Sequence, residues 1–148
     1  MTGTVIGFDV RRNEGGGEVC IGWCVCLPGA VAVEQGLLQV DINQPLSGHA
    51  EADILKLLNS VHSVAIGGGR LVTEDTDAVL SVLTEFAHCV DWGMTLPPMS
   101  VLQAPCESLA RYHDMREHAL HIAQAASFNG SKQRWRAKRK RDQFTLHV

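Results

Sequence analysis

The chain has 148 residues, of which 45% are hydrophobic and 20% charged, a composition typical of an ordinary soluble globule that excludes global disorder. No apolar run reaches the length of a membrane span, and the N-terminus lacks the basic-then-apolar order of a signal peptide. We therefore expect one domain that stays inside the cell, in the cytoplasm, nucleoid or nucleus, and is not secreted.

The net charge of −3 conceals a division along the chain. Residues 1–131 hold six basic and fifteen acidic residues, whereas residues 132–148 hold seven basic residues and one acidic residue. This asymmetry predicts a globular domain over residues 1–130 and a basic C-terminal arm over residues 131–148. The five cysteines are an odd number without the spacing of a disulfide framework, which favours reduced thiols in an intracellular setting.

The first predicted strand, Val5–Val10, is apolar except for one carboxylate, Asp9, near its end. A buried strand rarely holds an unpaired Asp, because a carboxylate out of water costs several kcal/mol or gives up its charge. Two interpretations stay open. Asp9 either caps backbone amides in the turn over residues 11–17, or serves a metal or phosphate site at the mouth of a sheet.

Two further predicted strands, Glu18–Leu27 and Ala30–Val40, follow across short turns, which predicts an antiparallel three-stranded meander. The remaining predicted elements alternate between helix and strand, and are helix Glu51–His62, strand Val64–Ile66, helix Thr76–Trp92, strand Met99–Gln103 and helix Ser108–Phe128. The order βββαβαβα predicts an α/β three-layer fold, in which helices cover the faces of a mixed five-stranded sheet.

Two short motifs make this order resemble the ribonuclease H-like superfamily, and within it the RuvC-type Holliday-junction resolvases and their YqgF-type relatives. Val5-Ile6-Gly7-Phe8-Asp9 resembles the family's opening "IGIDPG", and residues 117–123, Glu-His-Ala-Leu-His-Ile-Ala, resemble its closing "ADALAIA". The resemblance implies an endonuclease that cuts branched DNA. It also implies that acids from the first strand, the middle of the domain and the last helix hold Mg²⁺.

By position, the resemblance assigns the first-strand carboxylate to Asp9. On the last helix the family's closing Asp is replaced by His118, and Asp114 lies one turn earlier on the same side of the helix. Both are assigned to the site, while Glu117 points nearly opposite and is a reserve. The alternative for His118 is an ordinary polar flank of the helix.

The middle acid departs from the RuvC pattern, which has a Glu at the end of the fourth strand. The strand predicted here ends in Ile66 and three glycines, and Glu74 follows only in the loop, where acids usually serve a helix N-terminus. YqgF-type proteins carry an acid after the fifth strand, near Glu107. The resulting catalytic set is Asp9, Glu107, Asp114 and His118, with Asp9, Asp114 and His118 as metal ligands and Glu117 and Glu74 in reserve.

The basic arm predicts contact with nucleic acid, because seven of the thirteen basic residues fall within ten positions beside an aromatic residue that could stack on a base. Such contacts bind phosphates and do not read sequence. A nuclear-localisation run or a solvated tail is the alternative. The predicted nucleic-acid-binding residues are Lys132, Arg134, Trp135, Arg136, Lys138, Arg139, Lys140 and Arg141.

Three functions remain open on the sequence. The first is a Mg²⁺-dependent nuclease acting on branched DNA as a homodimer, since symmetric resolution of a four-way junction needs two active sites, or a YqgF-like nuclease acting on structured RNA. The second is a catalytically inactive adaptor that keeps the fold and binds nucleic acid. The third is an interaction module whose basic tail serves only as a localisation signal.

Overall fold

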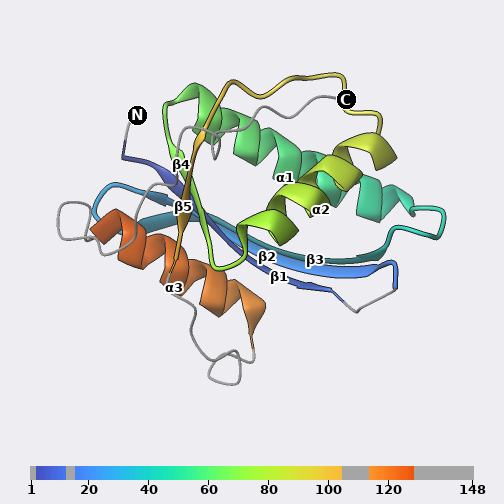
Figure 1. Cartoon of the computed structure of the whole chain (residues 1–148), viewed down its shortest axis with the longest axis horizontal. Coiled ribbons are helices and arrows are strands. Elements are labelled where there is room, and N and C mark those ends of the chain that lie inside the picture. The colour runs from blue at the N-terminus through green and yellow to red at the C-terminus, as the bar shows by residue number, and fades with distance from the viewer. Residues whose placement is uncertain (1–2, 13–15, 105–113, 129–148) are drawn as a thin grey trace.

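The computed structural model describes residues 3–12, 16–104 and 114–128, and within them one mixed sheet lies between two layers of helix (Figure 1). The strands are β1 (Val5–Arg12), β2 (Glu18–Leu27), β3 (Val31–Asp41), β4 (Arg70–Thr73) and β5 (Ser100–Gln103). The helices are α1 (Gly48–Ile66), α2 (Thr76–Cys89) and α3 (Met115–Phe128).

The strand order in the sheet is β3-β2-β1-β4-β5. The first three strands form the antiparallel meander expected from their short turns, while β4 pairs parallel with β1 and β5 pairs parallel with β4. The two parallel strands are each reached through a helical crossover, as parallel pairing requires. This topology confirms the predicted ribonuclease H-like α/β fold with its βββαβαβα order.

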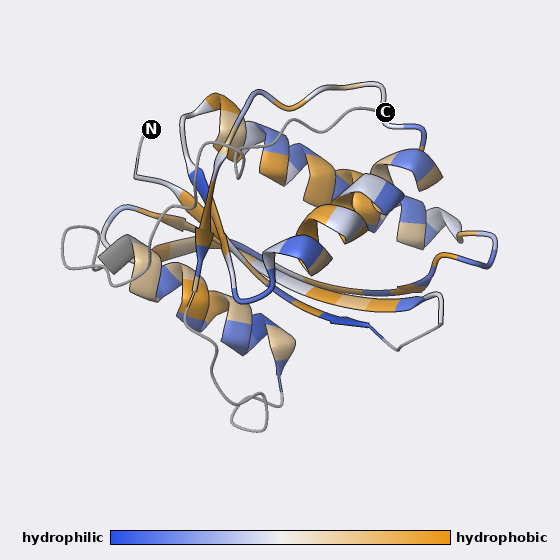
Figure 2. Ribbon diagram, viewed as in Figure 1, coloured by the Kyte–Doolittle hydropathy of each residue, from blue (hydrophilic) through white to orange (hydrophobic). Residues whose placement is uncertain are grey.

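The two faces of the sheet bury separate apolar clusters, because successive side chains of a strand point to opposite sides. On one face, Ile6 and Phe8 of β1 pack in the cluster that includes the buried stripes of α1 and α2. On the other face, Val5 packs with Cys24 and Cys26 of β2 beneath α3. In Figure 2 the strands are mostly hydrophobic while the helices carry both colours, in agreement with sheet burial on both faces.

The fourth strand does not lie where the sequence predicts it. Residues 64–66 are the last residues of α1, and the strand is Arg70–Thr73. Val64 and Ala65 continue the buried stripe of the helix, which includes Leu57, Leu58 and Val61, so their apolar run belongs to a helical and not an extended period. The glycines that follow end the helix, with Gly68 in a left-handed conformation at φ +76°. The correction moves the end of β4 to within one residue of Glu74.

Helix α3 covers the face of the sheet opposite α1 and α2 (Figure 1). Its described part, Met115–Phe128, agrees with the last two thirds of the predicted helix Ser108–Phe128, and residues 105–113 lie outside the described residues. No described helix is long and apolar enough to cross a membrane.

Candidate functional site

Three ionisable side chains from distant parts of the sequence meet beneath the first turns of α3. His118 Nδ1 lies 2.9 Å from Asp9 Oδ2, and its Nε2 lies 3.3 Å from Glu74 Oε1. The His118 side chain is fully buried, and the side chains of Asp9 and Glu74 are 4% and 12% exposed. One imidazole therefore bridges two nearly buried carboxylates.

Two glycines allow α3 to approach the sheet closely enough for this contact. A Cβ at Gly7 would lie 2.7 Å from the backbone oxygen of Ala119 and 2.9 Å from its next-turn neighbour, the Ala123 Cβ. A Cβ at Gly22, which pairs with Asp9 across β1 and β2, would lie 2.7 Å from the Met115 backbone oxygen. The helix backbone thus rests directly on the strands, and His118 is brought down beside Asp9.

Glu74 enters the cluster from the end of β4, which lies next to β1 in the sheet and runs parallel to it. Gln103 of β5 donates a hydrogen bond from Nε2 to the backbone carbonyl of Glu74, and its Oε1 accepts from the Thr76 hydroxyl at 3.0 Å. The neighbouring Asp75 has a different task, because its side chain caps α2 by accepting from the Ala78 amide at 3.1 Å. Of the two adjacent acids, one serves the helix and the other the cluster.

Arg11 completes the surroundings of Asp9 and was missed by the sequence reasoning. Its NH2 group lies 3.0 Å from the same Asp9 oxygen that contacts His118. The signal was present, since residues two apart on a strand share a face. Two carboxylates thus face one guanidinium and one imidazole.

The donors fit the Mg²⁺ that the resemblance implies. Mg²⁺ takes oxygen ligands, and one or two carboxylates commonly hold it while water and substrate phosphates fill the remaining positions. Asp9 and Glu74 supply two carboxylates, and each has an oxygen within 3.3 Å of the His118 ring. Within the described ranges, no three His, Cys, Asp or Glu side chains form a ready-made metal-binding group. Asp9 and Glu74 would therefore hold the ion, with His118 beside it.

The remaining predicted site residues either lie away from the contact of His118 with Asp9 and Glu74 or fall outside the residues that the structure describes. Asp114 accepts a hydrogen bond from the Arg116 amide at 2.8 Å, and its side chain is 38% exposed. This backbone bond, together with the Arg116 guanidinium, lowers the Asp114 pKa. Glu117 is exposed, as predicted from its position on the helix. Glu107 and the basic arm, residues 131–148, lie outside the described residues, so their roles stay predictions.

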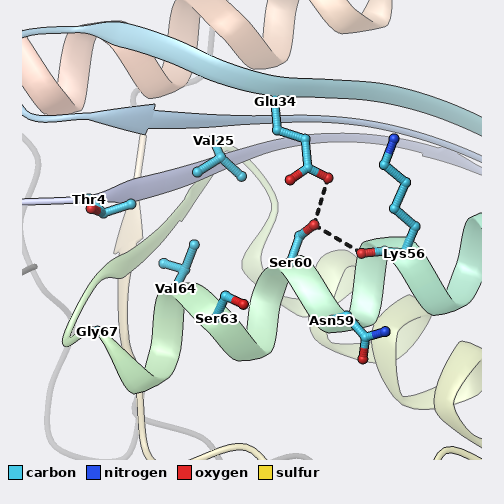
Figure 3. A pocket seen from close by; sticks show the side chains of 9 residues that line it. All are labelled: Thr4, Val25, Glu34, Lys56, Asn59, Ser60, Ser63, Val64 and Gly67. Carbon is cyan, nitrogen blue, oxygen red and sulfur yellow. Dashed lines mark hydrogen bonds between the residues drawn. The ribbon is translucent and has the colours of Figure 1, made fainter.

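A separate cavity of about 510 Å³ lies on the opposite side of the sheet, between α1 and the strands β2 and β3 (Figure 3). Its polar lining includes Glu34 of β3 and Lys56 of α1, and the Ser60 hydroxyl lies 2.6 Å from the Glu34 carboxylate. Because this cavity is on the α1 face, it shares no lining residue with the Asp9 cluster.

Two buried thiols lie beneath α3, where Cys24 Sγ and Cys26 Sγ are 3.8 Å apart. Their hydrogen bond raises the pKa of Cys24, to which burial also contributes, and lowers the pKa of Cys26. Among the described cysteines none forms a disulfide. Both thiols act as small apolar side chains in the core under α3.

Comparison with known proteins finds weak structural similarity. No family model and no curated protein matches the sequence. The crystal structure of RNase H1 from the halophilic archaeon Halobacterium salinarum is 12% identical, with a TM-score of 0.42 over 80% of this chain and 97% of that one. The N-terminal RNase H domain of rv2228c from Mycobacterium tuberculosis is 10% identical, with a TM-score of 0.38 over 88% and 96%. The fold assignment therefore stands on the strand order described above.

Proposed function

We propose that this protein is a nuclease that hydrolyses phosphodiester bonds in nucleic acid, with its centre at Asp9, Glu74 and His118. The observation that carries the proposal is their convergence from positions far apart in the chain. One comes from the first strand, one from the end of the fourth and one from the last helix, which are the elements from which the resemblance draws its acids. Nearly buried ionisable groups gathered in this way are typical of functional sites.

Each residue has a distinct task in the proposal. Asp9 and Glu74 would hold Mg²⁺, which would supply an activated water and polarise the phosphodiester. His118 is a positioning residue, because its Nδ1 forms a hydrogen bond with Asp9 at 2.9 Å while its Nε2 lies 3.3 Å from Glu74. Arg11 also positions Asp9, because it contacts the same carboxylate oxygen as His118.

Within this class we propose branched DNA, as in the RuvC-type resolvases, as the substrate. The basic arm would lie along the phosphate backbone, and a homodimer would supply two cutting sites to a four-way junction. Structured RNA is the alternative substrate. That alternative, which follows the YqgF-type resemblance, would require Glu107 in addition to Asp9.

The catalytically inactive adaptor is a second candidate, favoured by how closed the cluster is. The Asp9 side chain is 4% exposed, and one of its oxygens already contacts both Arg11 and His118. An adaptor would bind nucleic acid through the same arm without cutting it.

Cleavage of a synthetic four-way DNA junction and of a structured RNA, with Mg²⁺ and with EDTA, separates the two candidates. Wild-type protein is expected to cut only with Mg²⁺, and the Asp9→Asn and Glu74→Gln variants are expected to lose at least a hundredfold in rate. Asp53→Asn, at an exposed acid of α1, is the matched control and should cut as the wild type does. Tight binding without cutting by all four proteins would refute the nuclease and support the adaptor.

A further inference from the structure

A hollow of about 500 Å³ opens beside the Asp9 cluster, between the ends of β1, β2 and β3 and the start of α3. Its lining combines two cations, one acid, one amide, one thiol and two apolar side chains, namely Arg11, Arg116, Asp114, Gln39, Cys20, Leu37 and Met115. Arg11 belongs to both places, because it lines the hollow and also contacts Asp9 at 3.0 Å. A ligand in the hollow would therefore lie directly against the proposed centre.

The two arginines give the hollow the chemistry of a phosphate site. Guanidinium groups bind phosphate oxygens through paired N–H donors, and Arg11 and Arg116 approach from different elements. The Arg116 side chain is 51% exposed, so its donors are accessible to a ligand. A phosphate between the arginines would lie next to the phosphodiester that Mg²⁺ at Asp9 and Glu74 would bind.

The apolar part of the hollow has the chemistry of a surface for a base. Leu37 is 46% exposed although it is a large apolar residue in a strand, and Gln39 lies two residues further along the same face of β3. An exposed aliphatic side chain beside an amide offers a base an apolar contact surface and hydrogen bonds to its edge. Bases in a duplex already stack on each other, so this surface suits an unpaired base.

We propose that the hollow binds one unpaired nucleotide of the substrate next to the bond that is cut. Arg11 and Arg116 take its phosphate, and Leu37 contacts its base. The position relative to the cut bond rests on the proposed function, whereas the binding of an unpaired nucleotide does not. The substrate class is thereby narrowed to nucleic acid with unpaired nucleotides at a branch, bulge or single-stranded end.

Asp114 leads to a second prediction, in which a substitution strengthens nucleotide binding instead of weakening it. Its carboxylate lies 3.6 Å from the Arg116 guanidinium and competes with any phosphate for it. Asp114→Asn removes that competing charge, and Asn keeps the ability to accept the Arg116 amide hydrogen bond. The variant is therefore expected to bind an unpaired nucleotide more tightly than wild type does.

Fluorescence anisotropy in EDTA, with a labelled single-stranded oligonucleotide and with the matching duplex, tests the proposal on the full chain. Leu37→Ala is expected to weaken single-strand binding about fivefold and to leave duplex binding unchanged, as for the loss of one apolar contact. Arg116→Ala should weaken single-strand binding and reduce its salt slope by about 0.7, the contribution of one phosphate contact. Asp114→Asn should strengthen it severalfold. Leu55→Ala and Lys56→Ala, on the exposed side of α1, are the matched controls and should bind as wild type.

Equal losses on single strand and duplex would overturn the proposal, and so would wild-type binding by both Leu37→Ala and Arg116→Ala, or weaker binding by Asp114→Asn. Because the measurement is made without metal and detects no cleavage, it can fail while the nuclease proposal holds. Conversely, a protein that never cuts can still bind the single strand through the hollow.

Discussion

The glycine at position 7 offers the most direct test of how the site is assembled. In Gly7→Ala, the new Cβ would lie 2.7 Å from the Ala119 backbone oxygen, about 0.7 Å short of the 3.4 Å at which ordinary contact begins. The atoms that it meets belong to the α3 backbone and to the Ala123 Cβ, neither of which can rotate away. The helix must therefore lift from the sheet, and His118, next to Ala119, must move with it.

The expected magnitude follows from overpacking in a tightly packed region. Inserting one methyl where the backbone has to shift costs about 1–3 kcal/mol in the free energy of unfolding. For a domain of this size a loss of about 2 kcal/mol lowers the melting temperature by roughly 4–8 °C. A shift of this size also lengthens the 2.9 Å contact between His118 and Asp9, and misplacement by about 1 Å can reduce catalysis about a hundredfold.

Urea unfolding gives the stability, and the imidazole resonances of His118 in NMR spectra report its contact with Asp9. Gly48→Ala is the control, because the structure places nothing within 4 Å of a Cβ there and the residue is the first of α1. It should be neutral or slightly stabilising, since Ala favours helix over Gly. If Gly7→Ala were as stable as Gly48→Ala and left the His118 resonances unchanged, close packing of α3 on the glycines would not position the site.

Three further expectations concern single residues. Asp75→Ala should lower the free energy of unfolding by about 1 kcal/mol because it removes the N-cap of α2, whereas Asp75→Asn should stay near wild type because Asn can still accept the Ala78 amide hydrogen bond. Equal losses of the two variants in urea unfolding would contradict this. Gln103→Leu should reduce cleavage more than Gly48→Ala does, because it removes the donor to the Glu74 carbonyl; unchanged cleavage would show that Glu74 is held otherwise. The rate of Cys89 alkylation in the native protein should rise with pH at a higher midpoint than that of an unstructured thiol, because burial and Glu85 raise the Cys89 pKa. Peptide mass mapping at a series of pH values measures this midpoint. A midpoint at or below that of the unstructured thiol would refute the expectation.

The comparison of sequence with structure shows which signals were sufficient for the fold. The alternating strands β1 to β3 and their short turns determine the meander, and the predicted boundaries lie within two residues of those observed. The fourth strand was misplaced because a three-residue apolar run fits a helix end as well as a strand. Only packing against the core, which buries Val64 and Ala65 along the stripe of α1, decides between them.

The sequence assigned two of the three residues that meet at Asp9 to the candidate site, and it kept Glu74 only as a reserve because the fourth strand was misplaced. Asp9 and His118 were assigned by their position in matching motifs, and the structure does bring them into contact. Glu74 was held in reserve because the strand before it was placed six residues too early. Periodicity on α3 grouped Asp114 with His118, but the direction of a side chain in the first turn depends on capping, and the Arg116 amide holds the Asp114 carboxylate.

The seating of α3 on Gly7 and Gly22 has a consequence for how this protein can vary. Helix α3 places His118 next to the carboxylates and Arg116 in the lining of the neighbouring hollow, so the proposed centre and the proposed nucleotide site both depend on the position of this one helix. A substitution among the buried residues of α3 that tilts the helix would move His118 and Arg116 together, so repacking the helix cannot adjust one of them alone. Variants with a new substrate preference should therefore arise first on β3, where Leu37 and Gln39 line the hollow from a strand and not from α3.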